Sequence, residues 1–341
     1  MYGYSPLIIL LFTVKMDPIE LKDMNPSDDE QLYHILTKDR MSLPLFLNGK
    51  TYADLIGMFQ KITDAHDIGI RKLLLGDPTI SHSIYELPTN ELVTGIIRIC
   101  SQFGIKMVEE IGAGTGLLAA RLISAGLSVL PTDGHVWKET MNLGMKYTPV
   151  HSQYICDYLD PKIKRAGCCM VAWPPQNSMV MNRYGYVELW EYISHRLPYL
   201  FIWIGDPMYE NRYAFYMYVR MRELGYRLIT LPIKQICYKD SVDNMSHSVL
   251  TLCIHSDVKG GELVDKKSLL AVIGRENCHS EVRPMSYHRV VKDLIDDHQL
   301  PPWFQSVEDQ QLIERVGIQL LRGKVIPETI TTPEQLKKWA R

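Results

Sequence analysis

The chain has 341 residues, 46% of them hydrophobic, which is enough to bury the core of one large domain with additions or of two domains. Its 37 Lys and Arg residues and 39 Asp and Glu residues give a net charge of -2, which argues against a broad basic surface for nucleic acid and leaves room only for a local basic groove. The 7 cysteines are irregularly spaced and form no C-x-x-C pair, which argues against a disulfide framework and a structural zinc site. We therefore expect a reducing, cytoplasmic compartment and no bound metal.

The chain opens with an apolar segment, residues 6–14. A transmembrane helix needs roughly twenty apolar residues, so this segment is too short to be one. No basic side chain precedes it and no A-x-A cleavage site follows, as a signal peptide would require. We expect a tail without a membrane anchor, and Met16 is an alternative start to Met1.

The next part of the chain predicts a helical cap. A short helix is expected at residues 29–36, within a polar arm. The spacing of apolar side chains then predicts a helix over residues 52–75, which Asp77-Pro78 ends. We expect residues 1–80 to form this arm and cap.

From residue 92 onward, apolar strands alternate with helical patterns, which predicts a parallel sheet with helices on both faces. The predicted strands are residues 107–111, 127–131, 147–150, 168–173, 199–204, 227–233 and 249–255. The predicted helices are residues 92–103, 117–123, 187–197 and 214–224. Residues 234–248 are polar and show no helical pattern, so we expect the last two strands to pair antiparallel. We expect this domain at residues 81–257 and a helical C-terminal extension at 258–341, with helices near 287–296 and 308–321.

The most specific signal is a strand that runs into glycines and then into a helix. Glycines let the chain turn sharply and let a ligand approach the main chain, and a helix N-terminus offers unpaired N–H groups. In open α/β sheets, ligands bind beyond the carboxyl ends of the strands. We therefore predict a ligand site at the loop, with the amides around Ala113 and Thr115 directed at the ligand; the alternative is a tight turn without a ligand. The loop residues are Gly112, Ala113, Gly114, Thr115 and Gly116.

The spacing within this loop distinguishes classes of ligand. A dinucleotide fingerprint is G-x-G-x-x-G, but here the third glycine, Gly116, comes one position early. A P-loop has Lys followed by Ser or Thr at the helix start, where this chain has Leu117-Leu118. The pattern G-x-G-x-G after the acidic Glu110 resembles motif I of class I S-adenosylmethionine-dependent methyltransferases. The resemblance implies an α/β fold with a Rossmann-like seven-stranded methyltransferase sheet, and S-adenosyl-L-methionine as the cofactor.

The same resemblance implies further cofactor-binding residues. Asp133, followed by Gly134, ends the next strand and would hold the ribose hydroxyls, because a carboxylate accepts two hydrogen bonds from a diol. Asp157 and Tyr158 follow the third strand, where the family often places an acidic residue on the adenine amine. The alternative for Asp157 is a solvated loop residue.

The segment Tyr85-Glu86-Leu87-Pro88-Thr89 precedes the first helix of the sheet domain. By the resemblance, such a segment can close over the methionine end of the cofactor. The alternative is that Thr89 serves only as an ordinary helix N-cap.

The fourth strand ends in Trp173-Pro174-Pro175-Gln176, which we take as the candidate catalytic residues. Enzymes that methylate amines of adenine, cytosine or glutamine have Asn/Asp-Pro-Pro-aromatic there, whereas here Trp173 replaces the polar residue and Gln176 the aromatic. This departure argues against nucleic-acid amino methylation. Trp173 can face the cofactor's sulfonium in a cation–π contact or pack on the helix that follows, and the prolines stiffen the loop.

Over residues 85–225 the chain resembles instead a poorly described group of methyltransferase-like proteins with Trp-Pro-Pro at this position. The corresponding residues here are Pro88-Thr89, the glycine loop, Trp173-Pro174-Pro175, Ser178-Met179 and Gly205-Asp206.

Three functions fit these observations. The first is a methyltransferase acting on a small molecule or a protein side chain. The second is a nucleic-acid amino methyltransferase, and the third is a cofactor-binding scaffold or regulatory subunit without catalysis, with the terminal extensions available to a protein partner. A weakly acidic acceptor also needs a base, for which the strand ends offer His135, Asp206 and Glu210 without support from a motif.

Overall fold

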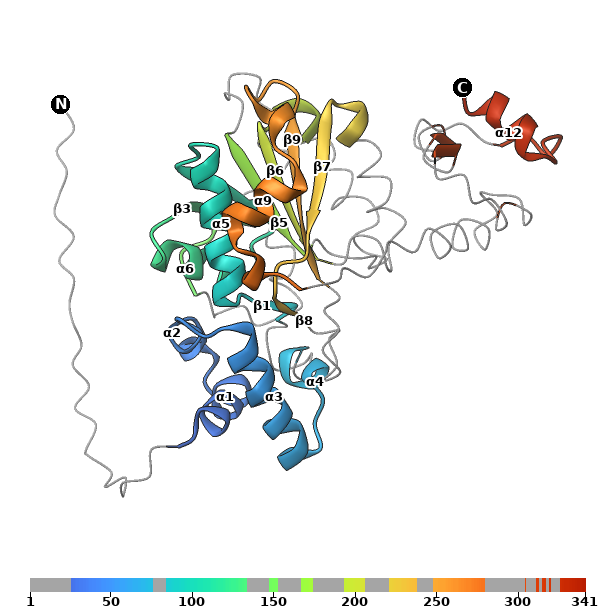
Figure 1. The fold of residues 1–341 in the computed structure, drawn as a ribbon. Helices are drawn as coiled ribbons and strands as arrows, with labels where there is room; N and C mark the ends of the chain where they lie inside the picture. The colour runs from blue at the N-terminus through green and yellow to red at the C-terminus, as the bar shows by residue number, and fades with distance from the viewer. Residues whose placement is uncertain are drawn as a thin grey trace, which may run out of the picture.

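The computed structural model (Figure 1) describes most of the chain in separate ranges. These are residues 26–75, 84–133, 147–152, 167–173, 193–205, 221–237, 248–279 and 326–341, together with 304, 311–312, 315–316 and 319.

A seven-stranded sheet with the order β4-β3-β2-β5-β6-β9-β7 forms the centre of the described structure. Neighbouring strands from β4 to β6 are parallel, whereas β9 runs antiparallel to both β6 and β7. The predicted Rossmann-like α/β sheet with an antiparallel last pair is therefore confirmed. The strands are β2 (Met107–Ile111), β3 (Ser128–Asp133), β4 (His151–Ser152), β5 (Cys168–Ala172), β6 (Leu200–Gly205), β7 (Tyr226–Leu231) and β9 (Val249–His255).

The third predicted strand, residues 147–150, is wrong in its position. The strand β4 begins only at His151, which pairs with Thr132 of β3. The preceding segment packs on the glycine loop instead: Tyr147 N–H donates to Thr115 O at 2.9 Å. This contact explains why the apolar residues before His151 do not join the sheet.

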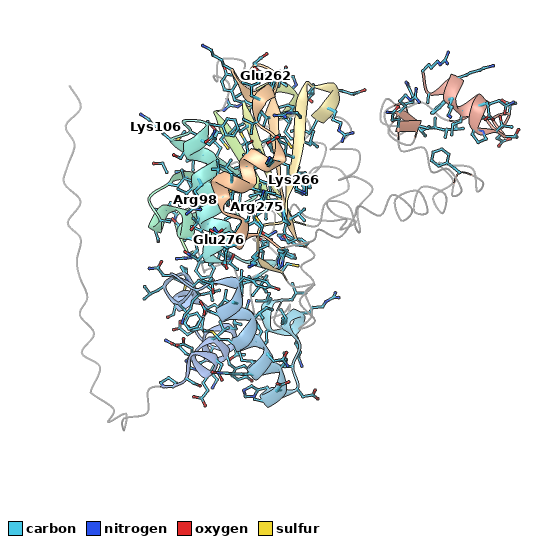
Figure 2. All side chains as sticks on the ribbon, in the orientation of Figure 1. Arg98, Lys106, Glu262, Lys266, Arg275 and Glu276 are labelled. Carbon is cyan, nitrogen blue, oxygen red and sulfur yellow. The ribbon has the colours of Figure 1, made fainter. Side chains whose placement is uncertain are left out.

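Within the described ranges, three helices lie over one face of the sheet: α5 (Asn90–Gln102), α6 (Leu117–Ser124) and α9 (Lys266–Ile273). α5 and α6 confirm the sequence prediction, because their apolar stripes are buried against the strands. The helix α9 was not expected; Figure 1 shows it beside α5. Arg98 of α5 joins the two helices by donating to Ile273 O at 2.5 Å, and Figure 2 labels it beside α5.

The opposite face of the sheet buries a second apolar cluster that includes Ile111, Val171 and Trp203. Residues 193–196 and 221–223 are helical, as expected for helices at 187–197 and 214–224. The last predicted residue of each, Leu197 and Leu224, is not helical, and residues 187–192 and 214–220 lie outside the described ranges.

In the part of the N-terminal cap that the structure describes, four helices share one apolar core. The predicted helix over residues 52–75 is interrupted, because Asp67 takes a left-handed conformation (φ 49°) that ends α3. The cap core also contains Leu87, Leu117 and Ile236, which belong to the sheet domain, so cap and sheet domain pack directly together. The cap helices are α1 (Asp28–Thr37), α2 (Leu43–Phe46), α3 (Tyr52–His66) and α4 (Ile70–Leu75), with the 3-10 turn η1 (Arg40–Ser42) after α1.

A small two-stranded sheet, which the sequence analysis did not predict, lies between the cap and the large sheet (Figure 1). It pairs β1 (Glu86–Leu87) antiparallel with β8 (Ile236–Cys237). The remaining described elements are the 3-10 turns η4 (Gly261–Leu263) and η5 (Arg275–Asn277) and the helix α12 (Pro333–Trp339). Within the described ranges, none of the helices has the length and hydrophobicity that crossing a bilayer requires.

Candidate functional site

The glycine loop connects β2 to α6 through three left-handed residues. Gly112, Gly114 and Gly116 have φ values of 68°, 55° and 75°. Residues with a Cβ rarely adopt this conformation, so the sequence Gly-Ala-Gly-Thr-Gly is what allows the strand to turn into the helix here.

The glycines of the loop differ in what surrounds them. Gly112 and Gly114 are exposed, and a Cβ built on either one would meet no heavy atom within 4 Å. A Cβ on Gly116 would lie 2.8 Å from Thr148 Cγ2, so this glycine permits close packing of the chain. The first two glycines therefore border open space, where a ligand can approach the main chain.

Asp133 lies beside this loop, as the sequence predicts. Its side chain is only 5% exposed, and its Oδ2 accepts a hydrogen bond from Gly114 N–H at 2.8 Å. The parallel pairing of Ile111 with Thr132 sets this position, because it places the residue after Thr132 next to the start of the loop. The acidic residue and the glycine loop thus meet at the carboxyl edge of the sheet.

One expected feature of the loop needs correction. The Ala113 amide does not point to a ligand, because it donates to Thr132 O at 3.0 Å and so fastens the loop to β3. Thr115 contributes its carbonyl oxygen to the segment before β4. The part of the loop that borders open space is therefore the surface of Gly112 and Gly114.

Glu110 lies two residues before the loop and is 2% exposed. Its Oε2 has no hydrogen-bond partner among the described residues. Burial, and in second place the negative charge of Asp133, raise the pKa of Glu110 to about 8. A positively charged group near these two carboxyl groups would favour the ionised form of Glu110.

Trp173 follows β5 in a left-handed conformation, with φ 47°. It continues the sheet ladder through its N–H, which donates to Ile204 O at 2.9 Å. Its indole is 8% exposed, and the indole Nε1 donates to Glu86 Oε2 at 2.6 Å. The same oxygen accepts from Ser248 Oγ at 2.6 Å. A Cβ added to Gly205 would lie 3.4 Å from the indole Cδ2, so the ring packs over this glycine.

The segment before α5 therefore has two roles. Thr89 caps α5, as expected for an N-cap, because its Oγ1 accepts from Leu92 N–H at 3.2 Å. It also donates to Lys234 O at 2.6 Å, next to β8. Glu86, three residues earlier, reaches Trp173. The motif that marks this segment does not distinguish Glu86, and no sequence pattern indicates Ser248.

The other candidate residues lie outside the described ranges, so their roles stay predictions. They are Gly134, Asp157, Tyr158, Pro174, Pro175 and Gln176, together with His135, Asp206 and Glu210.

Comparison with known protein families finds no family model that matches the chain. An uncharacterized protein of Acanthamoeba polyphaga mimivirus is 27% identical over 185 residues, which cover 51% of this chain and 37% of that protein. A second uncharacterized protein of this virus is 49% identical over 41 residues, which cover 12% of this chain and 7% of that protein. The chain thus spans well under half the length of the curated relatives it matches.

Similar solved structures include methyltransferases. The methyltransferase domain of bacterial CtHen1 is 12% identical, with 48% of this chain and 97% of that chain covered and a TM-score of 0.32. Magnesium protoporphyrin IX methyltransferase from Synechocystis with bound S-adenosylmethionine is 12% identical, with 69% and 100% covered and a TM-score of 0.30. An O-methyltransferase from Bacillus cereus is 13% identical, with 58% and 97% covered and a TM-score of 0.33. At this level of identity and superposition the likenesses carry no argument about activity, so a function has to be inferred from the chain's own residues.

Proposed function

We propose that the chain binds S-adenosyl-L-methionine at the carboxyl edge of β2 and β3 and transfers its methyl group to a small molecule or a protein side chain. The observation that carries this proposal is the pairing of open space at Gly112 and Gly114 with the Asp133 carboxylate, which is bonded to the Gly114 amide at 2.8 Å. A nucleoside ligand that rests on the glycines would bring its ribose hydroxyls to this carboxylate.

The charge of the site favours a cationic cofactor. Asp133 is a buried carboxylate beside the loop, and the partly buried Glu86 of β1 contacts Trp173 at the end of β5. Phosphate groups would be repelled there, and α6 begins with Leu117 where a phosphate-binding loop has lysine. S-adenosylmethionine carries a sulfonium and an ammonium group, which these carboxylates stabilise.

The residues of the chain mainly bind and orient in this scheme. When bound, the cofactor supplies an electrophilic methyl group, so the protein has to align donor and acceptor. Asp133 would hold the ribose and the surface of Gly112 and Gly114 would support the methionine part. Trp173 and Gly205, at the ends of the next two strands, would form one wall of the acceptor side.

A substitution at Gly114 tests the proposal. Replacing it with arginine fills the open space beside Asp133, so Gly114→Arg should lose detectable binding of S-adenosylmethionine and S-adenosylhomocysteine in calorimetric titration. Gly104→Arg is the matched control, because Gly104 also has a positive φ (65°) and open space around its Cβ position, but lies between α5 and β2, at the opposite end of β2 from the loop. The control should bind both ligands as the unaltered protein does.

Two outcomes would contradict the proposal. The unaltered chain could bind neither ligand, or Gly114→Arg could bind both with the affinity of Gly104→Arg. If the unaltered chain binds the ligands, an assay of methyl transfer to candidate small molecules and proteins then distinguishes an enzyme from a cofactor-binding scaffold.

A further inference from the structure

The backbone of Trp173 has a left-handed conformation, which residues with a Cβ rarely adopt. A left-handed tryptophan persists only where the surrounding structure fixes it. Here the main chain is fixed by the bond from Trp173 N–H to Ile204 O, and the ring is fixed by Gly205 on one side and by Glu86 at its N–H edge.

Glu86 is itself fixed from two directions. Its Oε2 accepts from the indole Nε1 and from Ser248 Oγ, each at 2.6 Å. The donors come from the end of β5 and the start of β9, and Glu86 belongs to β1. The indole edge therefore faces a carboxylate that is fixed in place.

Strand register places this arrangement next to the glycine loop. Ile111 of β2 pairs with Val171 of β5, and Ala172 of β5 pairs with Ile204 of β6. Continuing the first ladder by two residues and the second by one, Trp173 lies between the loop and Gly205. Neighbouring strands are about 4.8 Å apart, so the indole and the open space at the loop are within reach of one bound molecule.

The chemistry of methyl transfer gives this placement a consequence. The electron pair of the broken sulfur–carbon bond stays on sulfur while the acceptor's lone pair forms the new bond, so a cationic sulfonium becomes a neutral thioether. An aromatic face attracts a cation more strongly than it attracts a neutral thioether. An indole that donates its N–H to a carboxylate adds the negative charge of that carboxylate to the attraction.

We propose that Glu86 is a positioning residue that holds the Trp173 indole beside the methyl donor and thereby makes the site prefer the sulfonium cofactor over its thioether product. This inference rests on the proposed function of the loop. Glu86 thereby helps the site to select the cationic ligand. Weaker binding of the neutral thioether favours release of the product after transfer.

The test compares the affinities of S-adenosylmethionine and S-adenosylhomocysteine in calorimetric titrations. Glu86→Gln keeps an oxygen that accepts from the indole but removes the charge, so it should weaken S-adenosylmethionine about five- to tenfold and S-adenosylhomocysteine less than about twofold. Trp173→Phe keeps an aromatic ring but removes the N–H donor. It should therefore lower the ratio of the affinity for S-adenosylmethionine to that for S-adenosylhomocysteine, as Glu86→Gln does. Glu262→Gln, an exposed glutamate of η4 labelled in Figure 2, should leave the ratio unchanged.

The outcomes separate this inference from the proposed function. If the unaltered protein binds neither ligand, the proposed function fails and the role of Glu86 fails with it. If it binds both, and Glu86→Gln weakens them equally or not at all, only the role of Glu86 is overturned. If thermal melting shows that Glu86→Gln does not fold, the ratio of the two affinities in Trp173→Phe provides the test instead.

Discussion

Glu110 is a residue whose charge state depends on folding. In an unfolded chain its carboxyl group has an ordinary pKa of 4.5, whereas burial, with a smaller effect of Asp133, raises the pKa to about 8 in the folded chain. The folded state therefore binds a proton that the unfolded state has lost between these two pH values. Stability must fall as the pH rises through this window, because folding requires the uptake of a proton, and this uptake becomes less favourable as the proton concentration falls.

Glu110→Gln tests this account. The free energy of unfolding of the unaltered protein should lose up to about 1.4 kcal/mol for each pH unit between pH 4.5 and 8 because of Glu110 alone. The glutamine variant lacks this titration. Its free energy of unfolding should therefore increase relative to that of the unaltered protein as the pH rises, and the difference should level off above pH 8. Urea denaturation at pH 5, 6, 7 and 8.5 measures the difference. A constant difference between the two proteins across this range would show that Glu110 does not titrate as the structure indicates.

At the scale of elements, Glu91 of α5 joins the cap to the sheet domain. Both of its carboxylate oxygens accept from Tyr52 N–H, at 3.0 and 2.9 Å. Tyr52 is the first residue of α3, where backbone N–H groups lack partners within the helix and a negative charge is favourable. A buried side chain of the sheet domain thus completes the N-terminus of a cap helix.

Removal of this carboxylate should weaken the cap. Glu91→Ala leaves the Tyr52 amide buried without its acceptor, so we expect a loss of about 1.5–3 kcal/mol in unfolding free energy. Amide exchange should increase first in α3, before α5 and β2 are affected. Asp64→Ala, which removes an exposed carboxylate of the same helix, should change stability by less than about 0.5 kcal/mol. Equal effects of the two substitutions would mean that Glu91 does not hold the cap.

The elements that the sequence predicted well are those whose pattern is local. Residues 107–111 and 249–255 are apolar runs that became β2 and β9 with the predicted bounds, and the glycine loop reads directly from its spacing. The strands β1 and β8 could not be predicted, because a strand of two residues is too short to show an alternation of apolar and polar side chains. The Glu86–Ser248 contact joins residues 162 positions apart, so only the folded sheet brings them together. The helix α9 was missed because the charged residues around it obscured the short apolar stripe that packs on α5.

Across the described structure, the cap and the first residue of α6 share one apolar core. Leu117, the first residue of α6 after the loop, is buried with the cap helices. One turn later, Arg121 is 2% exposed, and its Nη1 donates to Asn48 Oδ1 at 3.2 Å and to Pro44 O at 3.5 Å. The helix that begins at the proposed cofactor site is therefore packed against the cap through both an apolar and a polar contact.

This packing predicts that a ligand at the loop stabilises the cap as well as the sheet. S-adenosylhomocysteine at a hundred times its dissociation constant should raise the unfolding free energy by about 2.7 kcal/mol if the whole described structure unfolds together. Amide exchange should then slow in α1 and α3 by the same free energy as in α5 and β2, although the cap helices need not touch the ligand. Gly114→Arg should show no change in either region. Protection confined to the sheet elements would mean that the cap opens independently, and that the contacts of Leu117 and Arg121 do not couple it to the loop.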